Sequence, residues 1–332
     1  MSLENFCGVK TCKEPLKLSK FTVLIGPNNS AKTTILMALF LLPFPWEVRS
    51  ISIMGLSKID FLSQFLYRST ESLVYRYSGK SIIESVVKGK QLKLEISSST
   101  GPQKVYVEGI EKELNSRDSG YYHFKLRDLL DLKYLDPVDY AMLIPNSDSF
   151  RQNLGARLGE ALNWSIVEKT GAHFKLVKDF VSKVIDDEFT EVTVKFNRLA
   201  LRKVTPSGEP FYVELEHVGD GVKRFLTCAL WLEAVKPRAV LWDDLEASAH
   251  PSLLNGIIKW LSEHDWQVVM STHSIDVLRE ILSVELEDAK ILSLRKLPDD
   301  TLTYREYSLD ELEEFFEKGV DVRKLFTPRE EL

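Results

Sequence analysis

The segment from Phe21 to Leu42 limits the possible folds of this chain more than any other part of the sequence. Phe21 to Ile25 is an apolar run rich in β-branched residues, a turn begins at Gly26, and an apolar stretch from Thr33 to Leu42 ends at Pro43. Apolar runs separated by Gly and Pro predict a buried strand, a tight turn and a buried helix. This order is typical of an α/β protein.

The turn carries a second signal, because residues 26–33 read GPNNSAKT. The run matches the phosphate-binding pattern GxxxxGK[ST], except that Ala31 replaces the second glycine. In such a loop, backbone N–H groups and the helix N-terminus hold the phosphates, while Lys32 reaches the β and γ phosphates and the Thr33 hydroxyl ligates Mg²⁺. The predicted nucleotide-binding residues are Gly26, Pro27, Asn28, Asn29, Ser30, Ala31, Lys32, Thr33 and Thr34. An ordinary strand-to-helix turn is the alternative.

Two carboxylates follow a second apolar run. Ala239 to Trp242 predicts a buried strand, and Asp243 and Asp244 come directly after it. A sheet strand delivers an acid to a nucleotide-bound metal in this way, so Asp243 would hold Mg²⁺ beside Thr33. Asp244 would then orient or deprotonate an attacking water, with Glu246 as the alternative base. Two solvated acids in a turn are the competing interpretation.

The remaining patterns divide the chain into a discontinuous core and an inserted segment. Leu253 to Leu261 and Val268 to Met270 predict a helix and a strand that continue the α/β order. Between Pro45 and Phe211, apolar alternation predicts hairpins around 92–107 and 192–201, with a helical stretch before the second. We therefore predict an α/β core of residues 1–45 and 211–300, an inserted α+β segment of residues 46–210, and a helical tail of residues 301–332 packed on the core.

Composition excludes several classes of protein. The chain has 43 Lys plus Arg against 49 Asp plus Glu, a formal net charge of −6, which argues against a protein that coats nucleic acid by bulk charge. Its three cysteines form no CxxC pair, so neither a zinc site nor a disulfide framework is expected. The longest apolar stretch, Ile35 to Phe44, is too short to cross a bilayer. We expect a cytoplasmic protein without a membrane partner.

Four motifs follow one another along the chain: GPNNSAKT, EHVGDGVKRFL, VLWDDLEASAHP and VVMSTHS. In this order the chain resembles the ABC-type ATPases of the SMC, RecF and OLD-like branch, especially their short stand-alone members. The resemblance spans the whole chain and implies a P-loop ATPase head with a mixed sheet and an inserted α+β segment. The second motif stands for the ABC signature, which implies that Gly219, Asp220 and Gly221 bind the γ-phosphate held by a partner subunit.

The resemblance further implies that His273 senses the γ-phosphate, and that Asp244 and Glu246 are the acids that follow the Walker B strand. ATP and Mg²⁺ would lie between two head-to-tail copies, so that nucleotide binding closes a homodimer and hydrolysis reopens it. Two departures from the family pattern predict slow hydrolysis. Ala31 adds a methyl group where backbone approaches phosphate, and Asp244 is one methylene shorter than the usual glutamate. Spacing does not choose among three candidates for the glutamine that senses Mg²⁺ in ABC proteins, which are Gln64, Gln103 and Gln152.

By resemblance, the partner of this switch is DNA or a DNA-processing protein, in DNA maintenance, repair or defence. A local basic patch of Arg198, Arg202 and Lys203 would favour direct contact with DNA. Lys223 and Arg224 either add positive charge at the signature or face solvent, and solvent is the favoured alternative. Two other functions stay open: a P-loop kinase or related phosphotransferase whose insertion closes over a second substrate, and a nucleotide-binding module with little turnover.

Overall fold

The computed structural model describes residues 1–42, 45, 55–87, 89–98, 103–108, 110–114, 141–184, 187–247 and 249–325. Within these residues, twelve strands form one large mixed sheet and three form a small antiparallel sheet. The strands of the large sheet, in spatial order, are β7 (Ile110–Leu114), β6 (Gln103–Val107), β5 (Lys90–Ser97), β4 (Lys80–Val87), β1 (Ser2–Phe6), β2 (Val9–Cys12), β15 (Thr301–Tyr307), β14 (Ala289–Lys296), β3 (Phe21–Ile25), β13 (Gln267–Ser271), β12 (Ala239–Trp242) and β8 (Ala141–Ile144). The strands of the small sheet are β11 (Pro210–Glu214), β10 (Arg198–Val204) and β9 (Glu191–Lys195).

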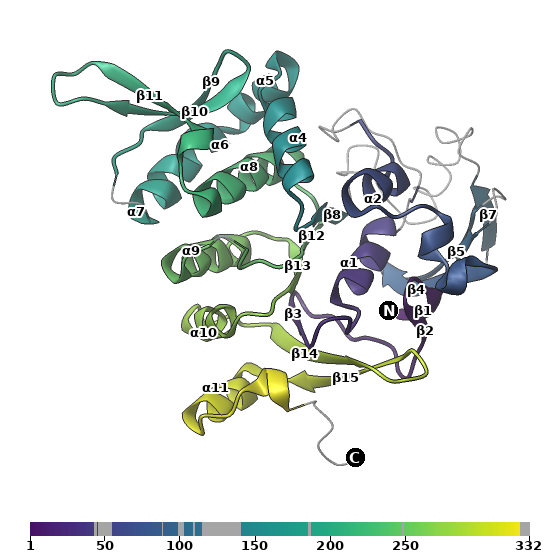
Figure 1. Ribbon diagram of the computed structural model, residues 1–332. Helices are drawn as coiled ribbons and strands as arrows, with labels where there is room; N and C mark the ends of the chain where they lie inside the picture. Colours follow the sequence, from purple (N-terminus) through teal and green to yellow (C-terminus); the bar gives the residue numbers. More distant parts are fainter. Residues whose placement is uncertain are drawn as a thin grey trace.

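Five neighbouring strands at one end of the large sheet run parallel, in the order β14, β3, β13, β12 and β8. Every residue of β3 and β12 is buried, as expected where helices cover both faces of a parallel sheet. Figure 1 shows α1 (Lys32–Leu41) on one face, with α9 (Pro251–Ser262), α10 (Ile275–Ser283) and α11 (Leu309–Glu317) stacked on the other. The carboxyl ends of these parallel strands, where α/β proteins bind ligands, therefore meet at one edge.

The other helices surround this centre, and none of the helices in the described part of the chain is both long and apolar enough to span a bilayer. They are α2 (Lys58–Leu66), α4 (Asp148–Leu158), α5 (Ala161–Thr170), α6 (Ala172–Leu176), α7 (Ser182–Val184) and α8 (Asp220–Val235). Short 3-10 turns lie at Glu71–Leu73, Tyr75–Tyr77, Leu215–His217 and Val322–Lys324, and a π turn at Val177–Val181 joins α6 to α7.

Most of the predicted elements form with bounds close to those expected. β3 and β12 have the predicted bounds, and α1 begins one residue before the predicted Thr33. Both predicted hairpins are present, with Leu92 opposite Val107 and Leu201 opposite Val192. Pro43, the predicted end of the first helix, lies outside the described residues.

The boundaries of the predicted inserted segment do not match the structure. Strands β4 and β8 lie within residues 46–210, but β4 pairs with β1 and β8 pairs with β12, so both belong to the large sheet. The predicted helical tail is also wrong at its start, because Thr301–Tyr307 is strand β15. Helix α11 follows it, and Ser308 and Glu311 form a capping box at its start. Apolar alternation reveals that a strand exists but not which neighbour it joins. The α/β order is interrupted between residues 46 and 210 of the sequence, but this stretch as a whole does not form a separate unit in the structure.

Helices α4 to α7 and the small sheet form a unit that lies outside the large sheet (Figure 1). Three of the helices, α4, α5 and α6, pack on α8. The β9–β10 turn lies directly on Gly159, where a Cβ atom would come within 2.2 Å of the carbonyl oxygen of Asn197. Only a glycine permits that approach. The unit therefore rests on the helix whose first turn carries the predicted signature residues.

Candidate nucleotide-binding site

The bend between β3 and α1 contains three residues with positive φ. The values are 144° at Gly26, 66° at Asn29 and 77° at Ala31. At Gly26 a Cβ atom would lie 2.5 Å from the carbonyl oxygen of Leu294, so only glycine fits there. Ser30 adds a buried hydroxyl without a hydrogen-bond partner in the bend. A glycine cradle beside an unpartnered polar oxygen suits a bound phosphate.

Ala31 carries a conformational cost that a glycine would not. Its φ of 77° and ψ of 18° are left-handed, a region that costs L-residues about 1–2 kcal/mol, partly offset in a substitution by the greater chain entropy of unfolded glycine. We expect Ala31→Gly to raise the free energy of unfolding by about 0.5–1 kcal/mol and to tighten ATP binding. Urea denaturation and ATP titration check this. The control Ala38→Gly, inside α1, should instead lower stability by about 1 kcal/mol or more, and equal effects of both changes would contradict the argument.

Lys32 begins α1 and lies inside the bend. Lys32 is buried, with 6% of its surface exposed. Its Nζ donates hydrogen bonds to the carbonyl oxygens of Gly26 at 3.0 Å and Pro27 at 3.2 Å. Burial lowers the pKa of Lys32, and the negative charge of Asp244 opposes that shift. The ammonium group therefore lies at the centre of the loop, where a phosphate would replace the two carbonyl groups as its partner.

Thr33 and Asp243 meet across the site, although 210 positions separate them in sequence. The Thr33 hydroxyl donates to the Asp243 carboxylate, with Oγ1 at 3.1 Å from Oδ1 and 3.0 Å from Oδ2. Ser271, at the end of the adjacent strand β13, donates to Asp243 Oδ1 at 2.6 Å. Burial raises the pKa of Asp243, and the hydrogen bond from Ser271 opposes the shift. The two predicted metal ligands thus lie side by side, with Thr33 in the first turn of α1 after β3 and Asp243 directly after β12, and strand β13 lies between these two strands.

These groups fit a magnesium–triphosphate. Mg²⁺ prefers oxygen ligands and is usually held by one or two protein groups together with phosphates and water. The described residues contain no group of three or more His, Cys, Asp or Glu that could hold a metal. Pro27, Asn28 and Asn29 are exposed along the same bend and Thr34 lies in the first turn of α1, as expected for a loop open to a ligand.

Asp244 is held in a fixed position by groups that the sequence does not single out. Its backbone has a positive φ of 47°, and its N–H donates to Ser271 Oγ at 2.9 Å. Asn146, two residues after β8, donates its amide to Asp244 Oδ2 at 3.2 Å. Among the glutamine candidates, Gln64 and Gln152 are exposed on α2 and α4, and Gln103 begins β6. The side-chain amide that contacts Asp244 therefore belongs to Asn146, a residue that was not among the candidates from sequence.

Glu246 and His273 are brought together, but through the histidine backbone. Glu246 Oε1 accepts the His273 N–H at 2.7 Å, and its Oε2 is buried without a partner. The His273 side chain is exposed after β13. Glu246 thus supports the loop that carries His273, whereas Asp244 is the acid that points toward Asn146. His250 caps the start of α9, as expected of a helix-start residue.

The signature residues lie at the start of α8. Gly219 is the N-cap and Asp220 the first helical residue, both exposed, and Gly221 is buried within the first turn. Gly221 therefore lies inside the helix, and its burial separates it from the exposed pair before it. Lys223 forms ion pairs with Asp220 at 2.9 Å and Glu216 at 3.2 Å. A cavity of about 650 Å³ adjoins the start of α8, and its lining includes Asp220, Lys223 and, from α4, Gln152.

Arg224 does not face solvent, contrary to the sequence-based prediction. Only 2% of it is exposed, and its guanidinium donates to the carbonyl oxygens of Asp243 at 3.0 Å and of Asp244 and Ala247 at 3.1 Å. Arg224 is buried because it lies on the face of α8 that packs against the turn after β12. Arg224 therefore joins the signature helix to the acidic turn within one chain.

The predicted basic patch is neutralised by acids on the same surface. The three ion pairs are Arg198 with Glu214 at 3.0 Å, Arg202 with Glu191 at 3.8 Å, and Lys203 with Asp187 at 3.0 Å. The sequence shows the basic residues as a cluster, because their partners come from neighbouring strands and a preceding loop. This surface offers little free positive charge to a nucleic acid.

Comparisons with known proteins give one family match and similarities of fold. Residues 161–280 match the model of a family described as "AAA domain, putative AbiEii toxin, Type IV TA system". No curated protein matches the sequence at a significant level.

Two solved structures are similar over almost the whole chain. One is an Smc head bound to the C-terminal winged-helix domain of ScpA, with a TM-score of 0.59 and 13% identity, covering 93% of this chain and 97% of that one. The other is an Smc head domain with an extended coiled coil, bound to the C-terminal domain of ScpA, from Pyrococcus furiosus. Its TM-score is 0.53 at 11% identity, covering 96% of this chain and 98% of that one. The chain therefore has the P-loop α/β fold of the Smc head domains.

Proposed function

We propose that this chain is an ATP-binding, slowly ATP-hydrolysing head that dimerises on Mg-ATP and acts as a switch. The observation that supports it most strongly is the contact of 3.0–3.1 Å between the Thr33 hydroxyl and the Asp243 carboxylate. That contact joins the phosphate loop to the acid of the β12 strand. It is the arrangement that a metal-assisted transfer of phosphate to water requires.

Each residue of the site has a separate role in this proposal. Lys32 neutralises charge on the β and γ phosphates, and Thr33 and Asp243 hold Mg²⁺, which would supply further positive charge as a Lewis acid. Asp244, fixed by Asn146 and Ser271, orients the attacking water. Because its side chain is shorter than a glutamate, the water lies farther from the best position, and turnover is slow.

Dimerisation rests on the first turn of α8. Helix α8 has 16 residues, and unpaired N–H groups give its N-terminus a positive end that favours an anion. Gly219 and Asp220 are exposed there, so a phosphate held by a second copy can approach. A head-to-tail homodimer would complete two sites at once, each built from the phosphate loop of one copy and the signature of the other.

We place the switch in DNA maintenance, repair or defence, with a DNA-processing protein as the partner favoured over DNA itself. The two Smc heads of similar fold are bound to ScpA domains, which supports a protein partner. The net charge of −6 and the paired state of Arg198, Arg202 and Lys203 weigh against direct DNA binding.

Size-exclusion chromatography with light scattering tests the switch, combined with phosphate release. We expect Asp244→Asn to become a dimer with Mg-ATP but not with Mg-ADP, because it binds nucleotide without turning it over. Lys32→Ala should remain a monomer with either Mg-ATP or Mg-ADP. An Asp244→Asn protein that stays monomeric with Mg-ATP would overturn the proposed dimer.

The same assay separates the other functions. A wild-type dimer that forms with ATP but releases no phosphate would indicate a binding module instead of an ATPase. ATP consumption only with an added small-molecule acceptor would indicate a phosphotransferase. Retention on duplex or single-stranded DNA at low salt, lost as salt rises, would favour DNA over a protein partner.

A further inference from the structure

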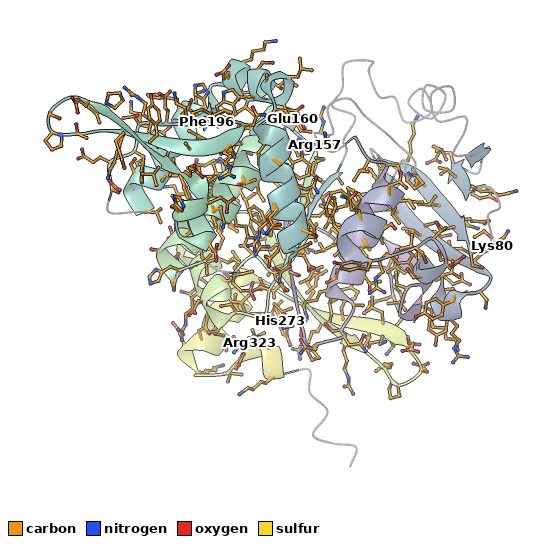
Figure 2. The ribbon with its side chains drawn as sticks, turned by 45° about the horizontal axis from the view of Figure 1, so that its top comes forward. Lys80, Arg157, Glu160, Phe196, His273 and Arg323 are labelled. Carbon is orange, nitrogen blue, oxygen red and sulfur yellow. The ribbon has the colours of Figure 1, made fainter. Side chains whose placement is uncertain are left out.

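We infer that Arg323, in the turn after α11, is a positioning residue that fixes the loop carrying His273. The inference rests on the proposed ATPase function, because it concerns the loop placed at the γ-phosphate. Arg323 Nη1 donates to the carbonyl oxygen of His273 at 2.6 Å, across 50 positions of sequence. Figure 2 shows the two residues as neighbours.

The guanidinium of Arg323 is itself held in one orientation. Asp321 accepts two parallel hydrogen bonds from it, from Nε at 2.9 Å and from Nη2 at 2.8 Å, and also caps the turn by accepting the Arg323 N–H at 3.1 Å. A two-pronged Arg–carboxylate pair fixes geometry as well as charge. With Nε and Nη2 directed to Asp321, Nη1 is left to reach the His273 carbonyl group.

The contact completes the restraint of the His273 loop. The Thr272 N–H donates to the Leu24 carbonyl oxygen at 3.1 Å, the His273 N–H donates to Glu246, and the Ser274 N–H donates to Thr272 Oγ1 at 2.9 Å. These three bonds come from strand β3, from the turn after β12 and from the loop itself. Only the bond to the His273 carbonyl comes from the C-terminal end of the described chain.

The turn that carries Arg323 is firmly attached to the core. Val322, its neighbour, is completely buried among core residues, with an exposure of 0%. The side chain of His273 is exposed, whereas its backbone is held on both sides, by Glu246 at the N–H and by Arg323 at the carbonyl group. Arg323 therefore acts through the backbone of His273, and its charge is paired with Asp321.

Steady-state kinetics test this role with four variants: Arg323→Ala, Arg323→Lys, Asp321→Asn and, as a control, Arg279→Ala. Arg279 is an exposed arginine on α10, the helix that follows the loop. We expect Arg323→Ala to lower kcat about tenfold or more with the KM for ATP within about twofold, and Arg323→Lys to recover part of the loss. Asp321→Asn should also lower kcat. If Arg323 instead acted by its charge on phosphate, Asp321→Asn would lower KM, and that result would overturn the inference.

Hydrogen–deuterium exchange of the nucleotide-free protein gives a readout that does not depend on activity. Arg323→Ala should speed exchange of the peptide containing His273 about tenfold, as expected when one charge-assisted hydrogen bond is lost, while Arg279→Ala leaves it unchanged. Unchanged exchange in Arg323→Ala overturns the inference. If faster exchange occurs in a protein that neither binds nor hydrolyses ATP, the proposed function fails while the restraint of the loop by Arg323 stands.

Discussion

Asp243→Asn is expected to lower the rate of ATP hydrolysis at least about 100-fold and, at neutral pH, to raise the thermal stability of the nucleotide-free protein. The rate falls because the variant loses the negative oxygen that holds the metal beside Thr33, an interaction of several kcal/mol in metal-assisted reactions. The stability rises because Asp243 is buried, and burial disfavours its ionised form. Asparagine keeps an acceptor for Ser271 without the buried charge.

The sign of the pH dependence follows from the same group. The pKa of Asp243 in the folded protein is raised above the ordinary value of 3.8, mainly by burial. Between the unfolded and folded pKa values the native state binds more protons, so stability from this residue is lost as pH rises through the folded pKa. The excess stability of Asp243→Asn should therefore be greatest at neutral pH and shrink as the pH is lowered. Thermal melts at pH 7.5 and pH 5, with phosphate release at pH 7.5, measure both effects.

A control substitution separates the effects of Asp243→Asn on rate and stability from the effect of removing any one carboxylate. Asp265 has a side chain that is 97% exposed, so Asp265→Asn should change neither the rate nor the melting temperature. Wild-type hydrolysis by Asp243→Asn would show that the acid does not hold the metal, and the proposed site would then be wrong.

The elements that carry the candidate site were predicted correctly where each is encoded by one contiguous segment of sequence. The strand, bend and helix around Lys32 follow from local composition, and Asp243 follows from an apolar strand that ends in acids. Parallel strands bring their carboxyl ends to one edge, so the contact between Thr33 and Asp243 could be expected from two local patterns and one rule of topology.

The parts that sequence did not predict depend on which elements pack together. Asn146 reaches Asp244 only because β8 pairs with β12, a pairing that four apolar residues in a long inserted segment do not indicate. Arg323 and Arg224 lie far in sequence from the carbonyl groups that they contact. An arginine that directly follows a lysine suggests an exposed side chain, and tertiary packing reverses that expectation for Arg224.

Arg224→Ala is expected to be the most destabilising single change near the site, lowering the free energy of unfolding by about 3–5 kcal/mol. The guanidinium is buried and gives hydrogen bonds to three backbone carbonyl oxygens, and each buried acceptor left unsatisfied costs about 1–3 kcal/mol. Burial lowers the pKa of Arg224, so holding its charge inside the protein has a cost that these bonds offset. Urea denaturation measures the loss.

The neighbouring residue Lys223 supplies the control, because it lies on the same helix but makes only surface ion pairs with Asp220 and Glu216. Lys223→Ala should leave stability nearly unchanged, since such pairs contribute little. Arg224→Lys, which keeps the charge but cannot reach three acceptors in the same plane, should fall between the two. Equal stability of Arg224→Ala and Lys223→Ala would contradict this prediction. It would mean that water satisfies the three carbonyl groups and that Arg224 does not hold the acidic turn against the signature helix.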